Sequence, residues 1–227
     1  LLPADIVGTM IYNPSKNDFS VRKGPVFANF VLADEINRTS SRTLSCLLEA
    51  MEEGTVSADG ETIPLGAPFT IFATRNPIEF HGTFPIPEAA LDRFLVHVEL
   101  EYPEPHLEKE LYQGRGGNAT IDELEPVLSR EELLMLISAV PSVHVSAEVA
   151  EYAYRVVSAT RAHPEIELGV SPRAAVAWTN AGRARALLDG RDYVLPDDLK
   201  ALARVVLGHR IATSGGIKGS ERITEVL

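Results

Sequence analysis

The chain has 227 residues, of which 45% are apolar and 23% charged, proportions that are ordinary for a globular protein. Its formal net charge of −11 argues against a nonspecific nucleic-acid-binding protein, because such a protein needs a basic surface. The single cysteine excludes an internal disulfide and a cysteine-cluster zinc site, and no apolar run approaches the roughly 18 residues of a membrane-spanning helix. We therefore expect a cytoplasmic protein that neither binds nucleic acid nor inserts into a membrane.

The N-terminal part begins with extended patterns and continues with a helix. Two short extended pieces flank the turn-forming residues 13–18. The apolar run "VFANFVLA" (26–33) is typical of a strand that is buried on both faces. Leucines at helical spacing follow it, and they predict a helix that ends at Gly54.

Three further patterns complete this part of the chain. Asp59-Gly60 lies between alternating residues and predicts a type I′ hairpin. "PFTIFATRNP" (68–77) predicts a second buried strand, and residues 84–100 predict a short helix that runs into a third strand. Because strands alternate with helical patterns, we expect a parallel α/β sheet.

The pattern changes from strands to helices after about residue 103. We expect an α/β core over residues 1–103, a linker over 104–128 and an all-helical domain over 129–227. Four helix-start patterns support the helical domain: the capping box of Ser129 with Glu132, Ser146, Ser171-Pro172, and Pro196-Asp197-Asp198.

Two carboxylates, Asp34 and Glu35, directly follow the first buried strand. Ligands of open parallel sheets bind beyond the carboxyl ends of the strands. Asp34 could hold Mg²⁺ there, and Glu35 could orient or deprotonate a water in line with a γ-phosphate. Alternatively, both acids merely start a loop and favour the next helix through its dipole.

Asn76 ends the second strand in the same way. Its amide could position the same water or contact the γ-phosphate, or it could simply form a turn before Pro77. Taken together with the two acids at the end of the neighbouring strand, the functional interpretation is the better one.

Six segments follow one another along the chain: "LPADIVGT", "GPVFANFVLADEINR", "LLEAMEEG", "FATRNP", "GTFPIPEAALDRF" and "GVSPRAA". Together, and in this order, they resemble the MoxR family of AAA+ ATPases. The similarity extends from Leu1 to about Ile211, which is nearly the whole chain.

The resemblance implies a role for each candidate site residue. Asp34 and Glu35 match the Walker B pair, which ligates Mg²⁺ and activates water. Asn76 matches the sensor-1 residue. Arg93 matches the arginine finger, which reaches the nucleotide of a neighbouring subunit, and Arg173 matches the sensor-2 arginine on a lid helix. The implied cofactors are ATP and Mg²⁺. Without the resemblance, Arg93 could be a surface ion-pair partner of its neighbour in the sequence, and Arg173 could simply follow a proline-started helix.

The resemblance also implies assembly and partners. Family members form rings, usually hexamers, and the hairpins around residues 13–18 and 59–60 match the helix-2 insert and the presensor-1 hairpin, which face the pore. The implied role is chaperone-like remodelling or maturation of client proteins, with von Willebrand factor A domain proteins among the partners.

A phosphate-binding loop of the form G-x-x-x-x-G-K-[ST] is absent from the sequence, because no lysine is followed by serine or threonine. We therefore expect a P-loop-type (AAA+) core that is truncated at its N-terminus, and no appreciable ATP turnover by these residues alone. The alternative is a non-hydrolysing AAA+-like protein-interaction module. A metal hydrolase of unrelated type is disfavoured, because no H-E-x-x-H or carboxylate–histidine cluster occurs at ligand spacing.

Overall fold

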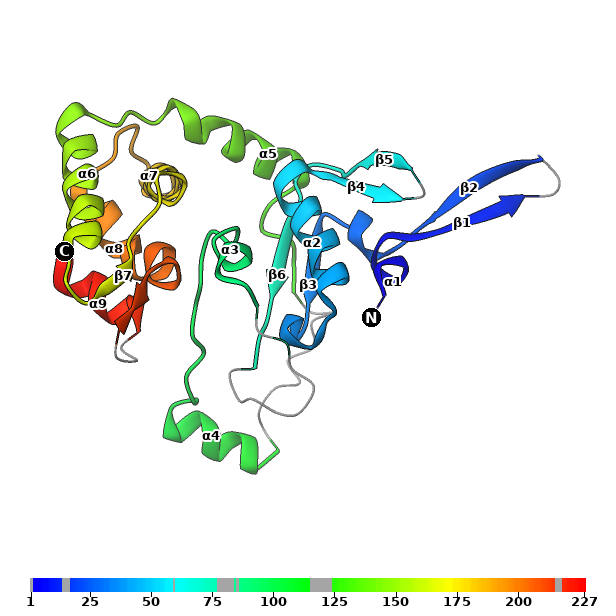
Figure 1. Cartoon of the computed structure of the whole chain (residues 1–227), viewed down its shortest axis with the longest axis horizontal. Coiled ribbons are helices and arrows are strands. Elements are labelled where there is room, and N and C mark those ends of the chain that lie inside the picture. The colour runs from blue at the N-terminus through cyan, green and yellow to red at the C-terminus, as the bar shows by residue number, and fades with distance from the viewer. Residues whose placement is uncertain are drawn as a thin grey trace. The chain divides into compact units, whose positions relative to one another are not determined.

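The computed structural model describes residues 2–13, 17–58, 60–76, 84, 86–114, 124–214 and 218–227. Packing divides the chain into two compact units, Leu1–Leu95 (unit 1) and Val96–Leu227 (unit 2), whose elements are labelled in Figure 1. Each unit is described separately. The domain limits at residues 103 and 128 stay predictions.

Unit 1 begins with a short helix and a hairpin. Helix α1 (Pro3–Val7) starts with a proline, which suits the first helical position because its missing N–H would have no partner there. Strands β1 (Gly8–Asn13) and β2 (Asp18–Lys23) pair antiparallel. The predicted extended pieces are therefore confirmed, whereas α1 was not expected. The turn residues 14–16 lie outside the described residues.

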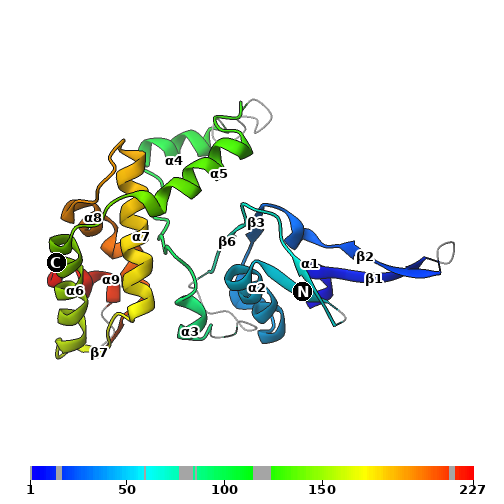
Figure 2. The same cartoon turned by 90° about the horizontal axis from the view of Figure 1, so that it is seen from above.

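The two predicted buried strands form a parallel pair. Strand β3 (Phe30–Ala33) pairs with β6 (Thr70–Ala73), so the parallel sheet is confirmed. Both strands are shorter than predicted: Pro25–Phe27 forms a 3₁₀ turn, η1, ahead of β3, and β6 ends at Ala73, three residues before Asn76. Helix α2 lies alongside the pair in both views (Figures 1 and 2). The expectation that both faces are buried is wrong, since large apolar side chains of the pair are exposed: Phe30 at 53%, Leu32 at 70% and Phe72 at 57%.

Helix α2 (Ser41–Glu53) agrees with the sequence analysis, and so does the antiparallel hairpin that follows it. The predicted type I′ turn stays a prediction, because Asp59 lies outside the described residues. The Ser40 hydroxyl accepts a hydrogen bond from the Thr43 N–H at 3.2 Å, and Gly54 ends the helix in the left-handed conformation with φ 64°. A residue with a Cβ is strained in that conformation, which explains the glycine. The hairpin consists of two antiparallel strands, β4 (Thr55–Ala58) and β5 (Glu61–Pro64).

The predicted third strand is wrong. Helix α3 (Glu88–Leu91) forms, but the residues that follow it, up to residue 100, belong to no strand. The backbone N–H of His97 donates instead to the carbonyl of Val205 at 2.8 Å. A strand needs a neighbour with which to form a ladder, and the described residues place none beside this segment. Its alternating apolar side chains, such as Leu100, are exposed.

Unit 2 contains the predicted helices. The capping box of Ser129 and Glu132 is present, with both reciprocal hydrogen bonds formed. Ser146 and Ser171 also accept N-cap hydrogen bonds. The helices are α4 (Pro105–Tyr112), α5 (Arg130–Ala139), α6 (Ala147–Ala162), α7 (Pro172–Leu188), α8 (Pro196–Leu207) and α9 (Gly219–Val226), with 3₁₀ turns η4 (Val140–Ser142) and η5 (Gly208–Arg210).

The core of unit 2 surrounds Trp178 of α7. This side chain is fully buried, and its Nε1–H donates to the carbonyl of Leu199 on α8 at 2.8 Å. Figure 2 shows α6 and α7 running side by side. The unit is not entirely helical, because strands β7 (Ile166–Leu168) and β8 (Ala212–Thr213) form a small antiparallel pair that the sequence analysis missed.

Candidate functional site

The carboxyl ends of β3 and β6 lie side by side, with Ala33 paired to Ala73 in the parallel register. Backbone hydrogen bonds continue beyond the strands: the Thr74 N–H donates to the Ala33 carbonyl, and the Ile36 N–H donates to the Thr74 carbonyl, both at 3.0 Å. Asp34 and Glu35 are therefore held against the end of the neighbouring strand, where an open parallel sheet binds its ligands.

The Thr74 hydroxyl connects the two acidic residues. It donates a hydrogen bond to Oδ1 of Asp34 at 2.5 Å and accepts one from the backbone N–H of Glu35 at 2.9 Å. One oxygen of Asp34 is thereby fixed. The sequence analysis did not single out Thr74. The available indication of its role was that Thr74 carries a hydroxyl group one residue past the end of the second strand, opposite the two acids.

Glu35 adopts the left-handed conformation, with φ 48° and ψ 54°, which is uncommon for a residue that is not glycine. The 3₁₀ turn η2 (Ile36–Arg38) follows it. Such conformations cost of order 1 kcal/mol or more and concentrate at functional sites. The Glu35 carboxylate lies 3.2 Å from Nε of Arg38, but both side chains are substantially exposed, so this pair contributes little to stability.

Asn76 lies at the same edge of the sheet. The side-chain amide of Asn37 donates to the Asn76 carbonyl at 3.1 Å, which ties the segment after β6 to η2. Within the part of the chain that the structure describes, Oδ1 of Asn37 is buried without a hydrogen-bond partner. A buried acceptor of this kind is normally satisfied by water or a ligand, so the site suits a hydrated ligand.

Arg93 belongs to the same unit. Its Nε atom lies 2.7 Å from Oε2 of Glu52, and its Nη1 atom donates to the Ala89 carbonyl at 2.8 Å. The contact with Glu52 on α2 was not expected from the sequence. Arg173 is the second residue of α7, in unit 2, so its relation to the carboxylates of unit 1 stays a prediction.

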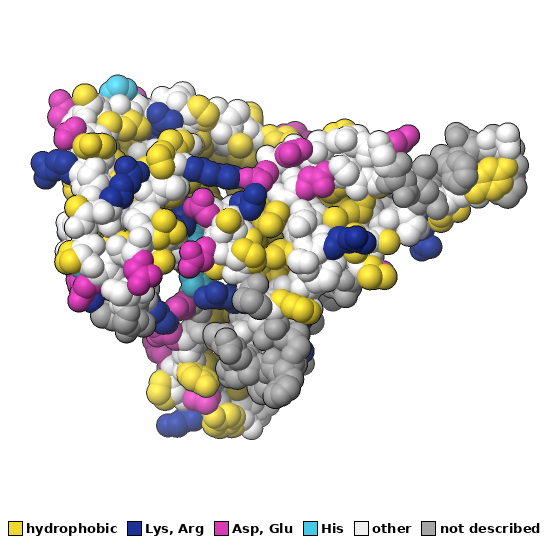
Figure 3. All heavy atoms as spheres, viewed as in Figure 1, with side chains coloured by type: hydrophobic (Ala, Val, Ile, Leu, Met, Phe, Trp, Pro, Cys, Tyr) yellow, Lys and Arg dark blue, Asp and Glu magenta, His cyan; other side chains and the backbone are white. Residues whose placement is uncertain are grey.

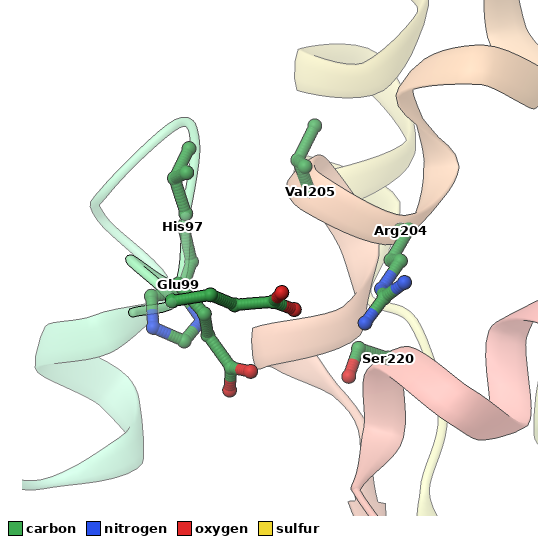
Figure 4. A pocket seen from close by; sticks show the side chains of 7 residues that line it. His97, Glu99, Arg204, Val205 and Ser220 are labelled. Atoms are coloured by element: carbon green, nitrogen blue, oxygen red, sulfur yellow. The ribbon is translucent and has the colours of Figure 1, made fainter. Parts of the chain in front are cut away.

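Unit 2 contains a second candidate, a polar cavity of about 240 Å³ between the segment after α3 and helices α8 and α9 (Figure 4). Figure 4 shows Glu99 and Arg204 directed into the same space. Both oxygens of Glu99 accept hydrogen bonds from Lys218, at 2.8 and 2.9 Å, and this contact lowers the pKa of Glu99. The charges in the cavity therefore compensate one another, and we assign no ligand to it.

Across the described residues, histidine, cysteine, aspartate and glutamate never gather in threes as a metal-ligand cluster. None of the helices in the described part of the chain combines the length and apolar character that crossing a bilayer requires.

Comparisons with known proteins agree with this architecture. A model described as "ATPase family associated with various cellular activities (AAA)" matches residues 1–96, and one described as "AAA lid domain" matches residues 158–226. The crystal structure of a candidate ATPase from Cytophaga hutchinsonii superposes with a TM-score of 0.88 at 37% identity, over 100% of this chain and 73% of that one. A full-length MCM homolog from Methanopyrus kandleri has a TM-score of 0.61 at 19% identity, over 93% and 44%, and shows the fold alone. Fold and family models define a AAA+ ATPase core followed by a lid.

Curated relatives narrow this class to one family. The chain is 44% identical to YeaC of Bacillus subtilis (strain 168), an uncharacterized protein, over 100% of this chain and 72% of that protein. It is 40% identical to "Chaperone MoxR1" of Mycobacterium tuberculosis, over 100% and 62%, and 31% identical to "Protein MoxR" of Methylorubrum extorquens, over 78% and 57%. The chain belongs to the MoxR family of AAA+ ATPases. It spans 57–72% of the length of these relatives.

Proposed function

We propose that this chain carries the hydrolysis half of an ATPase site. The observation that carries the proposal is the hydroxyl of Thr74, which joins the Asp34 carboxylate to the backbone of Glu35 at the end of a parallel strand pair. If Asp34 and Glu35 merely began a loop, neither this hydrogen-bonded bridge nor the costly left-handed conformation of Glu35 would be needed. Family membership supports the same interpretation.

The residues present suit magnesium and a nucleotide phosphate. Carboxylate oxygens are preferred Mg²⁺ ligands. Because Thr74 engages Oδ1 of Asp34, the proposal assigns the contact with the metal or its waters to Oδ2. When bound, the magnesium nucleotide supplies the γ-phosphoryl group that is transferred to water.

The other residues act on the attacking water and on developing charge. Glu35 accepts a proton from the water. Its ion pair with Arg38 is solvent-exposed and weak, so the carboxylate is available for this step. Asn76 orients the same water. Arg93 stabilises charge on the nucleotide of a neighbouring subunit, a contribution of about 10³–10⁵ in rate in phosphoryl transfer. Arg173 contacts the γ-phosphate of its own subunit.

The 227 residues contain no phosphate-binding loop motif. The proposal therefore assigns phosphate binding to a segment outside them. Without such a loop, we expect these residues alone to bind ATP weakly and to show no appreciable turnover, because phosphoryl transfer depends on positioning the phosphates.

The proposed biological role is ATP-driven, chaperone-like remodelling or maturation by a cytoplasmic homo-oligomeric ring, the hexamer that is usual for the family. One relative is named a chaperone, and the hairpins β1–β2 and β4–β5 occur where the family resemblance expects its pore elements. Proteins with von Willebrand factor A domains are the proposed partners.

The test is ATP turnover and ATP binding by the complete protein, comprising these residues and its phosphate-binding loop, and by its Glu35→Gln variant. We expect the variant to bind ATP and to lose turnover. Glu61→Gln, the same change at an exposed position of β5, is the matched control and should leave both unchanged. Failure of the unmodified protein to bind or hydrolyse ATP would instead favour the non-hydrolysing interaction module.

A further inference from the structure

Arg93 contacts the last turn of α2, which is distant in the sequence. The distance between its Nε atom and Oε2 of Glu52 is 2.7 Å, and the two side chains are only 28% and 29% exposed. Among the described residues, the Nε–H group is buried without an acceptor at hydrogen-bond geometry. Charge attraction at short range, more than a directed hydrogen bond, therefore holds Glu52 to Arg93.

Glu52 is poorly placed for the stability of its own helix. It lies in the last turn of α2, followed by Glu53 and the C-cap Gly54, and this turn contains no basic residue. The C-terminal end of a helix carries partial negative charge, so carboxylates there are unfavourable. Glu52 does make a favourable contact with Arg93, at 2.7 Å, and this contact connects the end of α2 to the arginine.

A second contact restrains the same guanidinium. The Nη1 atom of Arg93 donates to the carbonyl of Ala89, one turn earlier on α3, at 2.8 Å. Two different elements, α2 and α3, thus limit the rotation of one long side chain. Ordering a free arginine costs conformational entropy, and a group that is already oriented avoids this cost when it acts.

We propose that Glu52 is a positioning residue, which holds Arg93 in the orientation from which it reaches the nucleotide of a neighbouring subunit. The inference rests on the proposed function, in which Arg93 is the arginine finger. Because Glu52 and Ala89 engage the Nε and Nη1 atoms, the Nη2 edge of the guanidinium is assigned to the phosphate.

A double-mutant cycle in the complete protein tests this inference. Glu52→Ala should lower kcat about tenfold at unchanged KM, as expected when an oriented group becomes mobile. In an Arg93→Ala background, Glu52→Ala should cause no further loss, because Glu52 acts through Arg93. Glu53→Ala removes the same charge from the neighbouring position of α2 and should leave kcat unchanged.

A second readout needs no turnover. In the 227-residue chain, the NMR signal of the Arg93 Nε–H group is assigned by its loss in Arg93→Ala. The rate at which this hydrogen exchanges with water should rise in Glu52→Ala and stay unchanged in Glu53→Ala. Any of three results would overturn the inference. They are an unchanged or raised kcat in Glu52→Ala, an equal loss of kcat when Glu52→Ala is made in the Arg93→Ala background, and an unaltered exchange rate of the Nε–H group in Glu52→Ala. Full turnover by Arg93→Ala would overturn the arginine-finger assignment itself, which separates the two failures.

Discussion

The two units differ in the size of their buried cores. Unit 2 has a continuous core around the fully buried Trp178 and Leu199. The cluster in unit 1 is built on four small or medium-sized side chains, Val7, Val26, Ala50 and Val56. Exposed apolar side chains remain on the β3–β6 pair, and Figure 3 shows hydrophobic side chains at the surface of the viewed face.

The difference follows from the kinds of element. A helix satisfies its backbone internally and buries one stripe, so a few helices can complete a core by themselves. A parallel strand pair needs cover on both faces, and within unit 1 the described residues show one helix, α2, alongside the pair. The proposed catalytic carboxylates therefore belong to the unit with the smaller buried core.

The largest loss of stability should follow a substitution at the centre of unit 2. Trp178→Ala removes a fully buried indole and its hydrogen bond to Leu199, so we expect a loss of about 3–5 kcal/mol in the free energy of unfolding. Urea denaturation of the 227-residue chain measures it. Val176→Ala, at an exposed position of the same helix, should cost less than about 0.5 kcal/mol. A loss below 1 kcal/mol for Trp178→Ala would contradict the placement of Trp178 at the centre of the unit 2 core.

A smaller loss of stability should follow a substitution at the start of α8. The buried carboxylate of Asp198 accepts two hydrogen bonds from Arg191, at 2.7 and 2.8 Å, and one from the Leu195 N–H at 2.8 Å. The contact with Arg191, followed by that with Leu195, lowers the pKa of Asp198. Asp198→Asn should cost about 1.5–3 kcal/mol at neutral pH, because hydrogen bonds to a charged group are lost.

The pH dependence of this effect has a definite sign. Since the folded-state pKa is lowered, the carboxylate stabilises the fold above its unfolded pKa of about 3.9, and this stabilisation is lost as pH falls through the folded pKa. Urea denaturation at a series of pH values should show a gap between the original chain and Asp198→Asn that closes in acid. Asp189→Asn, at the exposed partner of Arg191, is the control, with a smaller gap expected. A gap that stays constant into acid would refute the assignment.

The smallest loss of stability should follow a substitution on the exposed face of the β3–β6 pair in unit 1. Phe72 is 57% exposed and stacks on Phe30 with ring centroids 6.4 Å apart. In the 227-residue chain, Phe72→Ser should cost about 1 kcal/mol, mostly the stacking. Urea denaturation at two protein concentrations checks this value. A loss above about 3 kcal/mol would show that the face is buried in solution, and a dependence on concentration would identify a second copy as the cover.

Local patterns predicted most of the elements, because caps and turns depend on residues that are close in the sequence. The capping box at Ser129 and the C-cap at Gly54 are such cases. The third strand was predicted from apolar alternation alone and is wrong, since alternation indicates a strand only where a neighbouring strand can pair. The β7–β8 pair joins residues far apart in the sequence, so no local pattern indicated it.

By itself, the sequence identified the family and indicated that Asp34 and Glu35 directly follow one strand of a parallel pair, because strand ends depend on nearby residues. It placed the end of the second strand three residues too late, at Asn76 rather than at Ala73. The tertiary structure alone decided that Thr74 bridges the two acids and that Glu52 contacts Arg93. Each of these contacts joins segments distant in the sequence. Their geometry depends on strand register and on the packing of α2 and α3, which no spacing along the chain encodes.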